Sequence, residues 1–277
     1  MKKFWTMALL CLLLVFGAAC TSNSQGGEVV PDPADGIPVL LYHHLIPQAQ
    51  NRLHQDNPYV ISTEQFREQM QYLYDNGFQP ITLSQLEAYL YDDAPLPPNS
   101  VMIHFDDGYY SNFVYAYPIL QEFGFEAVLF LLSWRTEYLG DTQPPLDYDA
   151  FTWPAAHTIA AASDVFETAS HTHNMHDLRE GTNDTILATA DHEDILEDLH
   201  RSFDFVSNHR AFTYPKGQYN ETVIAALQAG GITMAFTTRA GYITRSSDPF
   251  SLERFTITNT TSFEEFQRIV HGRGLAQ

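Results

Sequence analysis

Residues 101–112, VMIHFDDGYYSN, join an apolar run to two adjacent aspartates and a glycine. The apolar run predicts a buried strand, and Gly108 predicts the turn that ends this strand. Asp106 and Asp107 repel each other when both are ionised, so the pair indicates either a solvated turn or a site that contains a cation. Successive side chains of a strand point to opposite sides, and the two carboxylates can therefore have different functions.

The remainder of the chain alternates apolar, β-rich runs with helical patterns and contains no internal repeat at a fixed period. This alternation predicts a parallel sheet with crossover helices, and about seven strands fit a barrel-like (β/α) fold better than a small sandwich. A single catalytic domain is expected over residues 37–277. The expected strands are 37–42, 101–106, 127–132, 165–172, 211–215, 234–238 and 255–258.

Capping residues define the starts of two of the expected helices. Ser62 and Gln65 predict a capping box at the start of a helix over 62–76, and Thr152 predicts the cap of another helix. A long acidic helix is expected over 188–207, with its apolar residues at helical spacing. The other expected helices are 84–91, 112–123, 221–229 and 262–271.

The N-terminal residues are typical of an export signal. Two lysines, an apolar run over 7–16 and small residues before Cys20 resemble a bacterial lipoprotein signal, and the run is too short to span a bilayer. We expect a signal peptide over 1–19, a lipid on Cys20 that anchors the protein to the membrane, and a flexible tether over 20–36. The expected location is the extracellular face of the bacterial cell membrane, and the alternative is an ordinary secretory signal and a secreted protein.

Composition narrows the class of protein. Of the two cysteines, Cys11 would leave with the signal and Cys20 would be lipidated. We therefore expect a packed core without disulfides, and the 44% of hydrophobic residues can supply it. The net charge of −20 argues against nucleic acid as a partner and does not identify a substrate. We expect a monomer.

Polar residues follow four of the expected strands at the point where each strand ends. The first strand is followed by His43 and His44, and the next by the two aspartates. Three histidines within SHTHNMH (170–176) follow a third strand, and Pro215 and Gly217 follow a fourth. Because functional sites of parallel α/β folds lie at the carboxyl ends of the strands, these residues are expected at one rim.

The residue types at this rim suit a divalent transition metal. If 171–173 is extended, His171 and His173 point to the same side, while His176 can return from a turn. Two imidazoles and one carboxylate leave coordination positions open for water, as in a catalytic metal site. A cation near both aspartates also relieves their repulsion, so one can bind it while the other accepts a proton.

Three stretches together carry a family resemblance: HFDDGYYSN (104–112), SHTHNMHDL (170–178) and RAFTYPKGQYN (210–220). They resemble the first three motifs of the polysaccharide deacetylase (NodB-homology) family, over residues from about 37 to the end. The resemblance implies a distorted (β/α) barrel of about seven strands that removes acetyl groups from sugars with a divalent metal. By position, Asp107, His171 and His176 resemble the family's metal ligands, and Asp106 resembles its catalytic base.

The resemblance also implies the remaining catalytic residues. Arg210 resembles the arginine that orients the catalytic aspartate, and Tyr214 resembles the residue whose backbone N–H helps to hold the oxyanion. The early YHHL (42–45) and the five-residue spacing of the metal histidines resemble the branch of biofilm poly-N-acetylglucosamine deacetylases. In that branch the general acid comes from the N-terminal strand, which favours His43 over His271 as the acid.

The expected activity is therefore hydrolysis of N-acetyl groups on cell-surface glycans that contain N-acetylglucosamine, with release of acetate. Zinc is the expected metal, and Co, Ni, Fe or Mn would also suit the ligands. An O-acetyl (xylan-type) esterase and a non-catalytic glycan-binding lipoprotein are the alternatives. Trp153, Tyr109 and Tyr110 are candidates for stacking on sugar rings, although core packing explains Trp153 as well. The sequence leaves the glycan unspecified.

Overall fold

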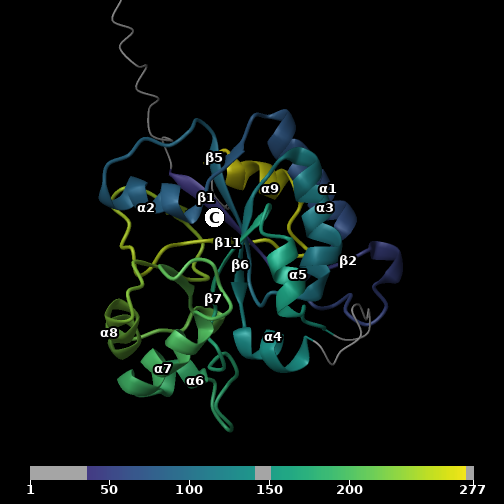
Figure 1. Ribbon diagram of the computed structural model, residues 1–277. Coiled ribbons are helices and arrows are strands. Elements are labelled where there is room, and N and C mark those ends of the chain that lie inside the picture. The colour runs from purple at the N-terminus through teal and green to yellow at the C-terminus, as the bar shows by residue number, and fades with distance from the viewer. Residues whose placement is uncertain (1–35, 141–150, 273–277) are drawn as a thin grey trace, which may run out of the picture.

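A computed structural model of the chain describes residues 36–140 and 151–272. The predicted signal peptide (1–19), Cys20 and all of the predicted tether (20–36) except its last residue lie outside the described residues. At the centre is a curled sheet in the order β10-β1-β5-β6-β7-β8-β9, around which the helices are arranged (Figure 1). The distorted (β/α) barrel of about seven strands is confirmed.

The central strands pair in parallel from β1 to β9, whereas β10 pairs antiparallel with β1. Two more strands extend the sheet, because β11 pairs with β1 and β4 pairs with β5, while β2 and β3 form a separate pair. The strands are β1 (Ile37–Tyr42), β2 (His44–Ile46), β3 (Val60–Ser62), β4 (Gln79–Pro80), β5 (Ser100–Phe105), β6 (Ala127–Leu131), β7 (Phe166–Ser170), β8 (Ala211–Thr213), β9 (Met234–Phe236), β10 (Tyr242–Ile243) and β11 (Phe255–Thr256).

Apolar residues cover both faces of this sheet, as expected for parallel strands with helices on either side. No helix within 36–140 or 151–272 has the length and apolar character needed to cross a membrane. The helices are α1 (Thr63–Asp75), α2 (Leu83–Tyr91), α3 (Tyr117–Phe123), α4 (Ser133–Leu139), α5 (Ala156–Ala161), α6 (Ile186–Thr189), α7 (His192–Ser202), α8 (Glu221–Ala229) and α9 (Phe263–Val270), with a π-helical turn at Asn112–Ala116 and 3₁₀ turns at Gln48–Gln50 and Pro215–Gly217.

The expected acidic helix over 188–207 is divided in two, and that prediction was wrong in its boundaries. Its first part, α6, ends at Thr189, and Asn220 donates a hydrogen bond from its side chain to the carbonyl oxygen of Ala188. This carbonyl would otherwise accept within a continued helix, so a residue distant in sequence helps to end α6. The second part, α7, starts at His192.

Two expected caps also differ from the structure. Ser62 accepts from the backbone N–H of Gln65, but the Gln65 side chain donates to the carbonyls of Thr258 and Thr261, so only half of the capping box forms. Thr152 does not cap a helix, because α5 begins later, at Ala156. Its carbonyl instead accepts from the Tyr110 N–H.

Candidate metal centre and active site

A cavity of about 410 Å³ opens at the carboxyl ends of the central strands. Side chains that follow β1, β5 and β7 meet there, although these strands are far apart in the sequence. The functional side chains at the cavity are His43, Asp106, Asp107, His171 and His176. The expectation that the strand-end residues share one rim is therefore confirmed for these five positions.

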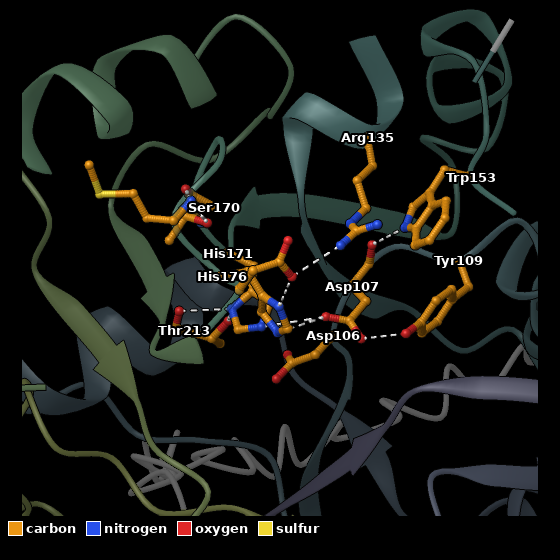
Figure 2. A network of polar contacts seen from close by, with 12 residues as sticks. Asp106, Asp107, Tyr109, Arg135, Trp153, Ser170, His171, His176 and Thr213 are labelled. Carbon is orange, nitrogen blue, oxygen red and sulfur yellow. Dashed lines mark hydrogen bonds and ion pairs between the residues drawn. The ribbon is translucent and has the colours of Figure 1, made fainter. Parts of the chain in front are cut away.

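Asp107, His171 and His176 lie close enough together to share one cation. Their ligand atoms are all within 4.8 Å of one another. The Asp107 Oδ1 atom is 3.7 Å from His171 Nε2 and 3.5 Å from His176 Nε2, and Figure 2 shows the two imidazoles facing this carboxylate. These separations fit a metal ion placed between the three atoms, since each ligand would then approach it at about 2 Å.

The orientation of the His171 ring prepares Nε2 to bind a metal. Its Nδ1 atom is 2.9 Å from the carbonyl oxygen of Thr213. A carbonyl oxygen can only accept a hydrogen bond, so Nδ1 carries the proton and Nε2 keeps its lone pair toward Asp107. The Thr213 hydroxyl lies 2.5 Å from the same Nδ1 atom and further restrains the ring.

The backbone directs Asp107 away from its neighbour. Asp107 has a φ of +69° and Gly108 a φ of +66°, so the chain turns sharply where β5 ends. A Cβ at Gly108 would lie 2.5 Å from Leu131 Cδ2, which together with the positive φ explains the glycine. Tyr109 donates to Asp107 Oδ2 at 2.7 Å, and the indole N–H of Trp153 donates to the Asp107 carbonyl at 3.2 Å (Figure 2).

The loop between His171 and His176 is held in a strained conformation. Thr172 has a φ of +78°, which is costly for a β-branched residue and occurs mostly where surrounding contacts enforce it. Asp198 of α7 supplies such contacts, because its carboxylate accepts from the N–H groups of His173 and Asn174 at 2.8 and 2.7 Å. A buried carboxylate thus fixes the turn that returns His176 to the cavity.

The donor atoms of this cluster fit a divalent metal ion. Among the described residues, Asp107 Oδ1 is a buried oxygen without a hydrogen-bond partner, and a cation would satisfy it. Burial tends to raise the pKa of the Asp107 carboxyl, but the charges of His176, His43 and His171 and the Tyr109 hydrogen bond leave this pKa below its ordinary value. An ionised carboxylate and two imidazoles form a tripod with open positions, as in catalytic zinc sites.

Asp106 has a different set of partners. The guanidinium of Arg254 donates to both of its carboxylate oxygens at 2.8 Å, and both side chains are buried. Arg254 is itself held by a hydrogen bond from Nε to the Thr237 carbonyl. Burial tends to raise the pKa of Asp106, but the adjacent charge of Arg254 holds this pKa well below its usual range. Asp106 is therefore an ionised carboxylate that Arg254 holds in a fixed orientation.

His43 reaches the same cavity from the end of β1. Its Nδ1 atom is buried without a partner among the described residues, and its ring lies 5.0 Å from the ring of Tyr59. Burial lowers the pKa of His43, and the carboxylates of Asp107 and Asp106 counteract this effect. His44 also lines the cavity, but its Nδ1 is 2.8 Å from the Ser111 hydroxyl, and burial lowers its pKa to about 3.

Comparison with known proteins now gives the family. The family model described as polysaccharide deacetylase matches residues 93–235, which is more than half of the chain. The chain belongs to the polysaccharide deacetylase family. The matched region contains Asp106, Asp107, His171 and His176, so the family assignment and the metal centre involve the same residues.

Relatives of known name agree with this family. A poly-beta-1,6-N-acetyl-D-glucosamine N-deacetylase of Escherichia coli (strain K12) is 27% identical over 95% of this chain and 44% of that protein, so the chain spans less than half of its length. The protein of the same name from Staphylococcus epidermidis is 26% identical over 73% of this chain and 69% of that protein. A solved de-N-acetylase of Aggregatibacter actinomycetemcomitans shares the fold, with a TM-score of 0.70, 22% identity, and coverage of 85% of this chain and 100% of that chain.

The structure contradicts the role predicted for Arg210 by resemblance to the deacetylase family. Arg210 is more than half exposed and forms an ion pair with Glu87 on the surface. The arginine that reaches Asp106 is Arg254, which precedes β11. The prediction failed because it followed the position of a motif in the sequence, whereas the contact with Asp106 comes from the residue just before β11, a strand that pairs with β1.

The oxyanion role predicted for Tyr214 is also contradicted. The Tyr214 N–H donates to the carbonyl of Phe236 at 3.1 Å and thus belongs to the pairing of β8 with β9. Its side chain is buried, and the hydroxyl donates to the Phe250 carbonyl. Neither polar hydrogen of Tyr214 is available to a substrate.

The other candidate residues lie as follows. His271 is exposed at the end of α9, where its ring bonds to the Tyr72 hydroxyl, so it lies outside the cavity of the deacetylase domain. His173 is outside the metal cluster, as expected, and its Nδ1 is 2.9 Å from the Ser133 hydroxyl. Trp153 is buried with Arg135 stacked on it at 4.5 Å, which agrees with packing rather than sugar stacking (Figure 2).

Proposed function

We propose that this protein is a metal-dependent polysaccharide deacetylase that hydrolyses N-acetyl groups of cell-surface glycans containing N-acetylglucosamine. One observation carries the proposal. A tripod of Asp107, His171 and His176 shares a cavity with Asp106, a carboxylate fixed by a buried arginine. A metal site beside a positioned base is the arrangement required for hydrolysis of an amide. The names of the Escherichia coli and Staphylococcus relatives support N-acetylglucosamine as the sugar.

The tripod, Asp106 and His43 have separate tasks in this reaction. A cation held by the tripod would polarise the acetyl carbonyl and lower the pKa of water. Asp106 accepts the proton of the attacking water, and Arg254 keeps its carboxylate aimed at that water. His43, which lines the same cavity, donates a proton to the leaving amine. The products are acetate and a sugar with a free amine.

The hydrogen-bond donor for the oxyanion follows from the segment 214–217. The Tyr214 N–H donates to Phe236, Pro215 has no N–H, and the Gly217 N–H donates to the Tyr214 carbonyl at 2.9 Å. The remaining N–H is that of Lys216, which lines the cavity and has a φ of +54°. We assign the oxyanion contact to this N–H, because a backbone donor fixed in advance stabilises developing charge without reorganisation.

The metal and the cellular location extend the proposal. Zinc suits two imidazoles and one carboxylate, and Co, Ni, Fe or Mn would also be accepted by these ligands. The sequence signal before Cys20 supports a lipid-anchored protein on the extracellular face of the bacterial cell membrane. In this location the protein would act as a monomer on acetylated polysaccharide, and its net charge of −20 argues against nucleic acid.

Acetate release by the purified, metal-loaded protein tests the function. Oligomers of β-1,6-linked N-acetylglucosamine should release acetate, and Asp106→Asn should abolish turnover while metal content is retained. Loss of metal from Asp106→Asn would show that the two aspartates have the reverse roles. Acetate from O-acetylated xylan alone would establish the esterase instead. Binding of the glycan without any acetate release would establish the non-catalytic alternative and refute the proposal.

A further inference from the structure

A second groove adjoins the catalytic cavity and has no part in the chemistry described above. Its volume is about 230 Å³, and two of its residues, Thr238 and Thr256, also line the catalytic cavity. The two depressions are therefore adjacent, and these threonines line both of them. A polysaccharide that places one sugar in the cavity can pass its neighbouring sugar into this groove, whose volume suits one monosaccharide.

The lining of the groove is rich in hydroxyl groups and contains one carboxylate, that of Glu265. Threonine hydroxyls both donate and accept, which matches the hydroxyl groups of a sugar. Lysine and arginine are missing from the groove among the residues that the structure describes. The polar residues that line it are Thr238, Thr256, Thr258, Thr260, Thr261 and Glu265.

The groove is a preformed feature of the fold. Thr258 and Thr261 are joined through their hydroxyls at 3.1 Å, and the Thr258 N–H donates to the Thr261 hydroxyl. The side chain of Gln65 in α1 donates to the carbonyls of both threonines. These contacts explain why Gln65 does not complete its capping box, and they tie the loop 258–261, which follows β11, to α1.

The charged side chains of the two depressions differ in a way that bears on substrate and product. Asp106, Asp107 and Lys216 line the catalytic cavity, where the two carboxylates are committed to the base and the metal site, whereas Glu265 is, of the described residues, the one charged residue that lines the groove. Deacetylation converts a neutral acetamido group into an amine that is protonated in neutral solution. The carboxylate of Glu265 in the groove favours this ammonium over the neutral acetamido group.

We propose that the groove is a binding subsite for a glucosamine residue, adjacent in the chain to the N-acetylglucosamine being deacetylated, and that Glu265 binds its ammonium group. This inference rests on the proposed function. It implies that the protein prefers chains that are already partly deacetylated. The net charge of −20 acts in the same direction, because it attracts a glycan that becomes cationic as acetate is released.

A substitution at Glu265 has a matched control on the same helix. Glu265→Gln removes the charge in the groove, and Glu264→Gln removes the same charge from the same first turn of α9. Glu264 is mostly exposed, pairs with Arg268 at 3.9 Å and does not line the groove. Both substitutions change the net charge and the helix terminus equally, so a difference between them reports the groove alone.

Three substrates test the preference: a fully acetylated β-1,6-linked pentamer, and two mixed pentamers in which a single glucosamine either precedes or follows the central N-acetylglucosamine. At least one of the mixed pentamers should show a kcat/KM per acetyl group about two- to five-fold above that of the fully acetylated pentamer. This advantage should disappear in Glu265→Gln and persist in Glu264→Gln. Equal values for all pentamers, or an advantage that survives Glu265→Gln, would overturn the proposal.

Calorimetric binding of a fully deacetylated glucosamine pentamer gives a readout that needs no turnover. The dissociation constant should rise about two- to five-fold in Glu265→Gln and stay unchanged in Glu264→Gln. Unchanged binding in both variants would overturn the subsite even in a fully active enzyme. If binding behaves as expected but no acetate is released from any pentamer, the subsite stands and the proposed catalytic function fails.

Discussion

Removal of the Arg254 side chain should damage both the stability and the activity of the protein. Arg254 has no exposed surface and makes two 2.8 Å hydrogen bonds to Asp106 and one to the Thr237 carbonyl. In Arg254→Met the carboxylate of Asp106 remains buried without its cation. The apolar replacement fills much of the space of the arginine stem, so the change chiefly tests the loss of charge and hydrogen bonds.

The size of the effect follows from the burial of both partners. Deleting one member of a buried ion pair costs about 3–5 kcal/mol, which corresponds to a fall in Tm of about 6–20 °C for a domain of this size. Asp106→Asn alone leaves Arg254 unpaired and should be similarly costly. The double variant leaves no unpaired charge, so its loss of stability should be smaller than the sum of the two single losses.

The catalytic effect should appear in kcat rather than in KM. Arg254 does not line the cavity, and it acts by positioning Asp106, so we expect kcat for acetate release to fall about 10–100-fold while KM changes little. Arg210→Met is the matched control, because its surface pair with Glu87 should contribute at most about 1 kcal/mol. If Arg210→Met abolished turnover and Arg254→Met did not, the assignment of the positioning arginine would be refuted.

Three further changes test other parts of the molecule. Tyr59→Ala should raise KM about two- to ten-fold, because it removes a half-exposed ring at the cavity. Tyr74 is similarly exposed but does not line the cavity, so Tyr74→Ala should leave KM unchanged. Equal KM values for the two variants would exclude sugar stacking on Tyr59. Burial and then the charge of Arg254 lower the pKa of His104 well below 6.5, so the folded state binds fewer protons than the unfolded state and loses stability as the pH falls below about 6.5. In His104→Phe, the free energy of unfolding in urea should fall less steeply with decreasing pH between pH 7.5 and 5, by at most about 1.4 kcal/mol per pH unit. His157 is exposed, so the pH dependence of His157→Phe should match that of the parent protein. The same pH dependence in all three proteins would contradict this reasoning. Chelation should abolish acetate release, and zinc should restore it. In equilibrium dialysis, the metal bound by His176→Ala should be at least about tenfold below that of the parent protein. Full metal content in that variant would show that His176 is not a ligand.

The metal centre could be predicted from sequence because each part of it is local. Asp107 follows an apolar strand within HFDDG, and the two histidines lie five residues apart after another strand. Parallel strands bring their carboxyl ends to one rim, so short-range patterns and one rule of topology place the three residues together. The same rule places His43 and His44 at this rim, and the resemblance to the deacetylase family is what singled out Asp107, His171 and His176 as ligands and His43 as the acid.

The partners of these residues could not be predicted, because they are set by packing over long distances in the sequence. Arg254 is 148 residues from Asp106, and the segment around it has no feature that separates it from any other arginine before a strand. Asp198 lies in an acidic helix in which several carboxylates look equally exposed, and only the structure shows which of them turns inward to the histidine loop. The direction of the Tyr214 N–H depends on its pairing with β9 and leaves no trace in composition or spacing.

The adjacent aspartates are compatible because the fold separates both their directions and their counter-charges. The N–H of Asp106 continues the pairing of β5 with β1 by donating to the Tyr42 carbonyl, which leaves its side chain against Arg254. Asp107 follows in a left-handed conformation, so its carboxylate points to His171 and His176. A permanent cation on one side keeps Asp106 ionised whether or not a metal is bound, whereas Asp107 keeps an unpartnered oxygen for the metal itself. Substituting Gly108 would disturb both arrangements at once, because the residue after Asp107 must also adopt a positive φ where Leu131 leaves no room for a Cβ.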